Sequence, residues 1–392
     1  MEDAKDGSGL TRRSLLAACT AGAVSCAEPS GPPFGRSEPA LLIHQTDLFR
    51  PHMDPDDHFD LACVYGLALA QRVKLLGVLC DSPPPGHSGD PDVAAVAMLN
   101  HLTGLSAPLV VGASHRPASR RDTLDTVPAS DLGGVRWLLE TLRGATRPAY
   151  ITVVGSCRDV ALAARRDPCL FARKCRGIFL NAGAGSPDTR PGDQLEYNVA
   201  LDPGSYASMF DAPCPIYWMP CFERVGPAVP DAGRASRHGT FYKFTMGDLF
   251  ARLSPPMQRY FLSMLEHESG SRWLRSLHDP VDPSLLARWS SQTRAMWCTA
   301  GFLHLAGLAA TAGGAVVPTA EAGESHVCRF AAVQVACDDA GHVRWRYGAA
   351  RPPRFKFEVT DPVRYGAAMA AALRHLIGPI GRAGTAQGED AP

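Results

Sequence analysis

The chain lacks several features that would assign it to whole classes of protein. Its lysines and arginines balance its aspartates and glutamates at 39 each, so no net charge favours nucleic acid or an anionic membrane. The cysteines, 12 in all, include no C-x-x-C pair, which argues against a zinc site. Beyond the N-terminus, no apolar run is long enough to span a bilayer. We therefore expect a globular protein whose partner is a small molecule. The sequence leaves open whether it forms a homo-oligomer.

The first 38 residues indicate an export signal and linker rather than fold. Arg12 and Arg13 precede an apolar segment from Leu15 to Val24, and Pro, Gly and Ser follow. This pattern resembles a twin-arginine signal and predicts a periplasmic or extracellular protein. Cys26 lies in Val24-Ser25-Cys26, which could be a lipidation site, or in a small-residue peptidase site. The alternative is a disordered basic leader.

From residue 39 to about 380, apolar strands alternate with amphipathic helices. This alternation is typical of an α/β fold of Rossmann type, with a mostly parallel open sheet covered by helices on both faces. Ligands bind such sheets at the carboxyl ends of the strands. We expect the strands at residues 41–46, 73–80, 109–111, 150–154, 177–181 and 216–219, and the helices at 56–70, 91–102, 131–142, 160–166 and 203–210.

The C-terminal half departs from this alternation. Residues 224–293 are rich in aromatic residues and Met and predict a helical insertion. A long helix is expected at 294–310, and then a small antiparallel segment with strands at 330–337, 343–347 and 355–359. The Asp338-Asp339-Ala340-Gly341 sequence predicts a hairpin turn between the first two. A helix at 362–376 closes the domain, and residues 381–392 are expected to be a disordered tail. Cys214 and Cys221 flank one strand and could pair in an oxidising compartment.

The most informative stretch is the junction between the first strand and the first helix, residues 45–60. It holds five carboxylates, which repel one another unless a cation or a polyhydroxyl ligand offsets their charge; they are Asp47, Asp54, Asp56, Asp57 and Asp60. A solvated turn or a helix start is the simpler interpretation of such a cluster. Its place at the carboxyl edge of the sheet favours a ligand site.

Four blocks, in order over residues 40 to 380, resemble the nucleoside hydrolase family of inosine-uridine-preferring N-ribohydrolases. The family opens a helix with D-x-D-P-G-x-D-D, and here Asp47 supplies the strand-end aspartate and Asp56-Asp57 the pair, with Gln45 at the leading position. The second block is residues 151–162, and the third comprises residues 177–184 and 196–203. The resemblance identifies the chain as a divergent member.

The resemblance implies a role for each matched residue. Asp47 would bind metal and act as base, while Asp57 would be a second metal ligand and the Val154 carbonyl a third. Asp56 would hold the sugar hydroxyls. Further substrate contacts would come from three residues of the third block, namely Asn181, Glu196 and Asn198.

The fourth block, which supplies a histidine for the leaving base, has two candidates. His278-Asp279-Pro280 matches the family's letters, whereas His304 matches its context in an Ala-rich helix before the last strands; we favour His304. Leu305 then replaces a metal-binding aspartate, and Asp54 is the substitute ligand. The family's Gly-Asn after the second strand is missing, and Asp81 is expected in its place.

The chemistry agrees with these roles. Ca²⁺ takes several oxygen ligands and orients water, and a neighbouring carboxylate accepts the proton. Carboxylates also stabilise an oxocarbenium-like sugar, and one carboxylate can accept two hydrogen bonds from a diol. The predicted function is metal-dependent hydrolysis of N-glycosidic bonds in nucleosides or related ribosyl compounds. Three alternatives stay open: a non-catalytic sugar- or nucleoside-binding protein, another glycosidase, and a transition metal held by His44, His52 and His58.

Overall fold

The computed structural model describes residues 38–50, 55–83, 89–187, 189, 193–226, 236–268 and 273–382. The predicted export signal with Cys26, the conditional metal ligand Asp54, His52 and almost all of the predicted tail lie outside these residues. No helix in the described ranges is long and apolar enough to cross a membrane.

A nine-stranded sheet forms the centre of the molecule, in the order β14-β13-β15-β8-β7-β6-β1-β3-β5. From β15 to β5 all neighbours pair in parallel, and β13 is antiparallel to both β14 and β15. The strands are β1 Ala40–Thr46, β3 Val73–Cys80, β5 Leu109–Val111, β6 Ala149–Val153, β7 Cys175–Asn181, β8 Ile216–Met219, β13 Cys328–Cys337, β14 Val343–Tyr347 and β15 Arg354–Val359.

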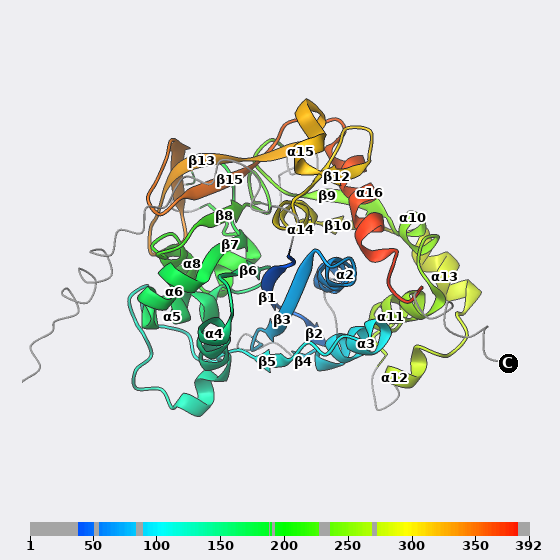
Figure 1. The fold of residues 1–392 in the computed structure, drawn as a ribbon, viewed down its shortest axis with the longest axis horizontal. Coiled ribbons are helices and arrows are strands. Elements are labelled where there is room, and N and C mark those ends of the chain that lie inside the picture. The colour runs from blue at the N-terminus through cyan, green and yellow to red at the C-terminus, as the bar shows by residue number, and fades with distance from the viewer. Residues whose placement is uncertain are drawn as a thin grey trace, which may run out of the picture.

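Helices cover both faces of the sheet (Figure 1). Successive residues of the central strands point to opposite faces, so Leu42 and Phe179 join one buried core while Ile43 and Leu180 join the other. The first core packs against α2 Asp56–Leu69, α3 Val93–Thr103, α11 Pro255–Leu265, α14 Thr299–Leu305 and α16 Tyr365–Ile377. The second packs against α4 Gly133–Gly144, α5 Arg158–Arg166, α6 Pro168–Lys174 and α8 Pro203–Met209. The predicted α/β fold class is confirmed.

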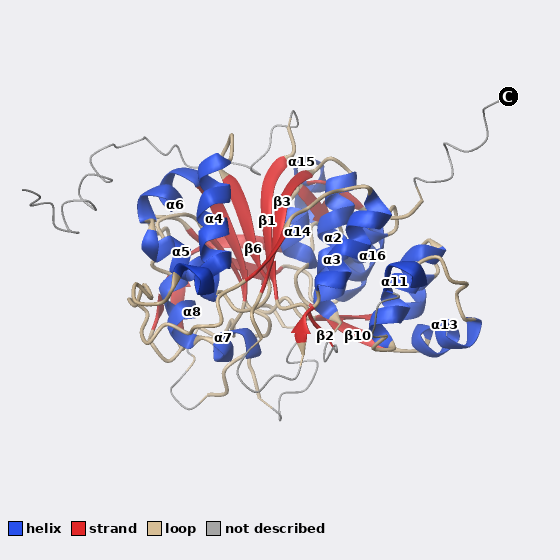
Figure 2. Cartoon of the chain, turned by 90° about the horizontal axis from the view of Figure 1, so that it is seen from below, coloured by secondary structure: helices blue, strands red, loops and turns tan. Residues whose placement is uncertain are grey.

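The strand order reverses between β1 and β6. From β1 the chain proceeds outward through β3 to β5, and it then returns to the other side of β1 and proceeds through β6, β7 and β8. Such a switch point leaves a crevice at the carboxyl ends of the two strands, where open α/β sheets bind ligands. Figure 2 shows loops, the short helix α7 (Tyr197–Leu201) and β2 (Phe49–Arg50) gathered at one edge of the sheet.

The three C-terminal strands and their hairpin are confirmed. The Asp338 N–H donates to the His342 carbonyl at 3.0 Å, and the Gly341 N–H donates to the Asp338 carbonyl at 3.1 Å. This segment is not a separate sheet, because β15 pairs in parallel with β8 and so extends the main sheet.

The predicted long helix at 294–310 is wrong. Residues Thr293–Met296 form β10, which pairs with β9 (Tyr242–Thr245), and Leu308–Ala310 form β11, which pairs with β12 (Val316–Pro318). Only Thr299–Leu305 is helical, and Gly307 follows in the left-handed region with φ +68°. The apolar run has no helix stop before Gly307, and its strand pairing depends on partners far away in the sequence.

The remaining elements are short. Besides β9 and β10, the region predicted as a helical insertion contains α10 Met246–Phe250, α11, α12 Trp273–Ser276 and α13 Pro283–Ser290. The others are β4 Asp90–Pro91, η1 Ala129–Leu132, α15 Thr319–Ala322 and η2 Gly323–Ser325.

Gly66 fixes the packing of α2 against α16, which gives a first testable prediction. A Cβ at Gly66 would lie 1.9 Å from the Leu376 carbonyl oxygen, and a backbone atom cannot move aside easily. We expect Gly66→Ala to lower the free energy of unfolding by about 3 kcal/mol, the upper end for overpacking. Chemical denaturation measures this loss. Gly144→Ala, where a Cβ meets nothing within 4 Å, is the matched control; equal stability of both variants would contradict the packing.

Candidate active site

Three chain segments meet at the switch point and bring their polar residues together. Asp47 follows β1, Asp81 follows β3 and Gly155 follows β6. The Asp81 N–H donates to the Thr46 carbonyl at 2.9 Å, and the Ser156 N–H donates to Asp81 Oδ2 at 2.6 Å. The three strand ends are thereby fixed to one another at the predicted edge of the sheet.

Gly155 permits this close approach. A Cβ at this position would lie 2.6 Å from Asp81 Oδ2 and 2.8 Å from both the Asp47 Cβ and the Asp47 nitrogen. We expect Gly155→Ala to displace both carboxylates, with a cost in stability of about 1–3 kcal/mol. Thermal unfolding measures this loss. Gly133→Ala, in open space, is the control, and wild-type stability in Gly155→Ala would refute this geometry.

Asp56 and Asp57 begin α2, where the helix dipole favours negative charge. The Thr46 hydroxyl donates to Asp57 Oδ1 at 2.7 Å. The charge of Asp47 raises the pKa of Asp57, so the two carboxylates lie close together in the buried site. The sequence places them ten residues apart, and the fold brings them together at the switch point.

Burial raises the pKa of Asp47, Asp57 and Asp81 well above the ordinary value of an aspartate. For Asp47, the charges of Asp81 and Asp56 raise the pKa further. For Asp57, the charge of Asp47 adds to burial, and for Asp81 the charge of Asp159 does so. A base whose pKa is raised is better matched to accepting a proton from water than an ordinary aspartate.

The Asn198 side chain donates hydrogen bonds to two main-chain carbonyls behind the carboxylates. Its Nδ2 donates to the Val154 carbonyl at 3.1 Å and to the Asn181 carbonyl at 3.2 Å. The Asn181 side chain does not point to open space, because its Nδ2 donates to the Met219 carbonyl at 2.9 Å and to Thr240 Oγ1 at 3.1 Å. Both residues are therefore held by the protein at the site's inner wall.

Glu196 is the N-cap of α7. Its Oε1 accepts from the Asn198 N–H at 3.0 Å, and its Oε2 accepts from the Gly183 N–H at 2.8 Å. Burial raises the pKa of this carboxyl, and the hydrogen bonds of the cap oppose that rise. Both carboxyl oxygens of Glu196 are thus used in hydrogen bonds within the protein. The resemblance implies that this residue contacts a sugar hydroxyl.

Neither histidine of the fourth block lies at the acidic cluster. His304 has its ring against Phe330, Tyr217 and Phe179, with ring centroids 4.6, 5.5 and 6.0 Å away, and burial lowers its pKa to about 4. His304 lies near the C-terminal end of α14, on the face of the sheet. Cys298 is the residue that precedes this helix, and at 1.5 Å per residue His304 is about 9 Å farther along the helix axis. His278 pairs with His101 near the end of α3, with 3.1 Å between their Nε2 atoms.

Two of the three histidines considered for a transition metal, His44 and His58, have other partners, and His52 lies outside the described residues. His44 is buried in β1, with its Nδ1 2.9 Å from Thr152 Oγ1. His58 is buried in α2, with its Nε2 3.1 Å from Asp92 Oδ2.

The residues of the acidic cluster supply some, but not all, of the oxygen ligands that a hard cation needs. Asp47 Oδ1 is buried and has no hydrogen-bond partner in the described part of the chain. A cation beside it would offset the repulsion between the buried carboxylates of Asp47 and Asp57. The Val154 carbonyl is a third oxygen nearby. In the described ranges no group of three or more His, Cys, Asp or Glu side chains could hold a metal ion, and Ca²⁺ takes six to eight oxygens. Water or ligand oxygens would have to complete such a shell.

Sequence reasoning missed several residues of this site. The Gln45 side-chain amide donates to Asp81 Oδ1, although the sequence showed Gln45 only as a departure from the family's aspartate. Tyr197 is 56% exposed beside the cluster, and after burial the charges of Asp47, Asp57 and Asp81 raise its pKa. No pattern in the sequence distinguishes Tyr197 from other exposed aromatics, but its place between Glu196 and Asn198 could have drawn attention to it.

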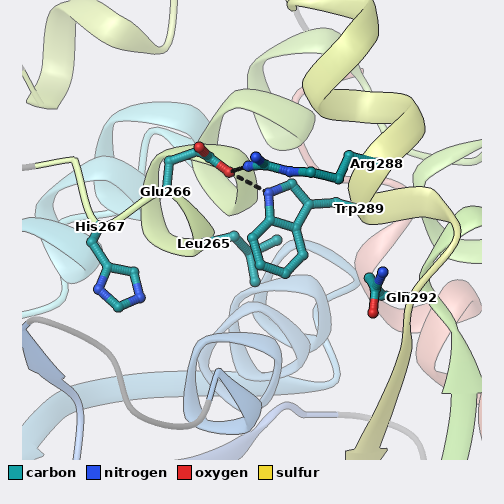
Figure 3. Close-up of a pocket in the computed structure, with 6 residues that line it drawn as sticks. All are labelled: Leu265, Glu266, His267, Arg288, Trp289 and Gln292. Carbon is teal, nitrogen blue, oxygen red and sulfur yellow. Dashed lines mark hydrogen bonds and ion pairs between the residues drawn. The ribbon is translucent and has the colours of Figure 1, made fainter.

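Two cavities lie outside the acidic cluster. One, of about 530 Å³, is an open hollow between α11 and α13 beside the Glu266, Arg288 and Trp289 side chains (Figure 3). None of the predicted site residues lines it. The other, of about 390 Å³, lies beyond Glu196 between the end of β7 and the β13–β14 hairpin, and Glu196 is the one predicted site residue in its wall.

Fold and site together define an α/β protein with a cluster of buried carboxylates at the switch point of its sheet. No protein-family model matches the chain, and no curated protein matches it. Among solved structures, it is similar to a plant nucleoside hydrolase at 16% identity and a TM-score of 0.46, covering 86% of this chain and 99% of that one.

Two further solved structures show the same level of similarity. The inosine-uridine preferring nucleoside hydrolase from Bacillus anthracis has 13% identity and a TM-score of 0.44, covering 86% of this chain and 99% of that one. The type III effector protein XopQ, complexed with adenosine diphosphate ribose, has 14% identity and a TM-score of 0.46, covering 87% of this chain and 95% of that one. The expected likeness to nucleoside hydrolases is thus present at low identity, and similarity at this level assigns no activity.

Proposed function

We propose that the chain hydrolyses N-glycosidic bonds in nucleosides or related ribosyl compounds. The observation that supports this most is the carboxylate cluster at the switch point, where burial raises the pKa of both Asp47 and Asp57, Asp81 is fixed between β1 and β6, and Asp47 Oδ1 has no partner in the described chain. The ordered resemblance of the sequence blocks supports the same reaction class.

In this proposal Asp47, Asp57 and the Val154 carbonyl would hold Ca²⁺, which would lower the pKa of a nearby water. Asp47 accepts the proton of the attacking water, because its pKa is raised by burial and by its acidic neighbours. The carboxylates stabilise the positive charge that develops on the sugar as the bond to the base breaks. Asp56, at the start of α2, accepts hydrogen bonds from vicinal hydroxyls.

Release of free ribose from a nucleoside panel tests the proposal. The panel contains inosine, guanosine, adenosine, uridine and cytidine, and the protein is assayed in Ca²⁺ and again after chelation. We expect ribose from at least one nucleoside in Ca²⁺ and a loss of that activity on chelation. Activity that chelation leaves unchanged would reject the metal, and no ribose from any nucleoside would reject these nucleosides as substrates.

A non-catalytic binding protein on the same scaffold is the second candidate, and one observation favours it. The oxygens of Glu196 cap α7, and His304 is enclosed by aromatic rings, so neither is placed to assist a leaving base. This candidate predicts calorimetric binding of ribose or a nucleoside with no turnover. Hydrolysis in the panel above excludes it.

A further inference from the structure

Two free thiols converge on one buried side chain at the site's inner wall. Cys298 Sγ lies 3.1 Å and Cys221 Sγ lies 3.5 Å from Asn181 Oδ1. Cys298 precedes α14, Cys221 follows β8, and Asn181 ends β7, so three separate segments meet at this amide. All three side chains are buried, with exposures of 2%, 4% and 3%.

We propose that Cys221 and Cys298 are a pair of positioning thiols. Their S–H groups hold the Asn181 side chain and, through it, the two hydrogen bonds that the Asn198 side chain makes in the candidate active site. The pair is distinct from the cysteine pairing considered from the sequence, because Cys214 and Cys221 lie at opposite ends of β8 and both are free. The link to catalysis rests on the proposed function, while the hydrogen-bond arrangement stands without it.

The orientation of the Asn181 amide identifies the thiols as donors. The Thr240 hydroxyl gives its proton to the Pro220 carbonyl at 3.0 Å, so toward Asn181 its oxygen is an acceptor. The Met219 carbonyl is an acceptor as well. The NH₂ end of Asn181 must therefore face these two groups, and the oxygen end must face the sulfurs. A flipped amide would set two carbonyl oxygens against each other.

The surroundings keep both thiols protonated. Burial raises the pKa of Cys298 well above its ordinary value, and the adjacent Asp60 carboxyl raises it further. Burial likewise raises the pKa of Cys221, and Glu196 adds to the rise. A thiol of this kind is a poor nucleophile that oxidises slowly, which suits a lasting S–H donor rather than a reactive cysteine.

The thiols reach the site through a short series of contacts. They fix the Asn181 side chain, the main-chain carbonyl of Asn181 accepts from Asn198 Nδ2, and the same Nδ2 donates to the Val154 carbonyl. Asn198 in turn donates its N–H to Glu196, which also accepts from Gly183. Loss of the S–H donors would leave Asn181 Oδ1 buried without a donor, and the contacts that this side chain anchors would loosen.

Hydrogen exchange followed by mass spectrometry tests the pair without any assay of activity. Cys221→Ala and Cys298→Ala remove a donor, Cys221→Ser and Cys298→Ser restore one, and Cys175→Ala removes a buried free thiol at the other end of β7 as a control. We expect exchange in peptides covering 181–185 and 196–199 to be about tenfold faster in the Ala variants, the effect of one lost hydrogen bond. The Ser variants and Cys175→Ala should match wild type there. Ser variants that exchange as fast as the Ala variants, or Ala variants that match wild type, would overturn the proposal.

Nucleoside hydrolysis by the same variants tests the link to catalysis. Where wild type releases ribose, kcat should fall in the Ala variants and recover in the Ser variants, and an unchanged kcat would overturn that link. A wild-type protein without hydrolysis would count against the proposed function, whereas the exchange result would still decide whether the thiols position Asn181.

Discussion

Replacing Asp47 by asparagine is expected to lower kcat/KM for the proposed nucleoside hydrolysis by about 10³-fold, because it removes the proposed general base, which would also hold the cation. Asn is nearly the same size as Asp, so the packing around Gly155 should persist. The substitution removes the carboxylate that would accept the proton of water, because an asparagine amide keeps one oxygen but is not a base near neutral pH. Steady-state assays of ribose release measure the effect.

Asp167→Asn is the matched control for this experiment. Asp167 caps α6 and pairs with Arg143 at 3.0 Å, away from the switch point. It should lower stability slightly and leave kcat/KM near the wild-type value. An Asp47→Asn enzyme with wild-type activity would mean that the base is another group.

Replacing Asp57 by asparagine is expected to stabilise the metal-free protein by roughly 1–3 kcal/mol at pH 8, in the range seen when buried charge is removed. The Asn oxygen can still accept from the Thr46 hydroxyl, while the repulsion with Asp47 is removed. Urea denaturation in the presence of a chelator measures the gain. Added Ca²⁺ should stabilise wild type more than the variant.

The pH dependence of this gain has a definite sign. The folded-state pKa of Asp57 lies above its ordinary value of 3.8, so the folded protein holds that proton more tightly. The stabilising contribution is full below about pH 4 and is lost as the pH rises through the raised pKa. Asp159 and Asp60, with pKa values raised by burial to about 6 and about 7, lose theirs in the same direction. The gain from Asp57→Asn should therefore shrink to nothing on acidification toward pH 4. A gain that grows on acidification would show that the carboxyl is not strained.

The sheet and the location of the site follow from the sequence because they depend on local patterns. Apolar runs such as residues 177–181 are too short and too uniformly apolar for surface helices, and alternation with helices forces parallel pairing. Once Asp47 and Asp81 are placed after their strands, parallel pairing brings them to the same edge. Their proximity therefore needs no knowledge of distant contacts.

The details that the sequence could not supply depend on contacts far apart along the chain. The apolar run at 294–310 divides into strand, helix and strand because β9 and β12 supply partners for its ends. The side chain of Glu196 turns into a helix cap, and that of Asn181 turns toward two cysteines. Residue type and spacing do not encode such rotations, which are decided by which donor is nearest in the folded protein.

A crystal structure of the protein with Ca²⁺ and ribose tests the central claim most directly, since it shows where a sugar binds. The account predicts ribose in the crevice at the ends of β1 and β6, with its hydroxyls on Asp56 and the cation on Asp47 and Asp57. Ribose seated away from these carboxylates, with the crevice free of both sugar and cation, would contradict it.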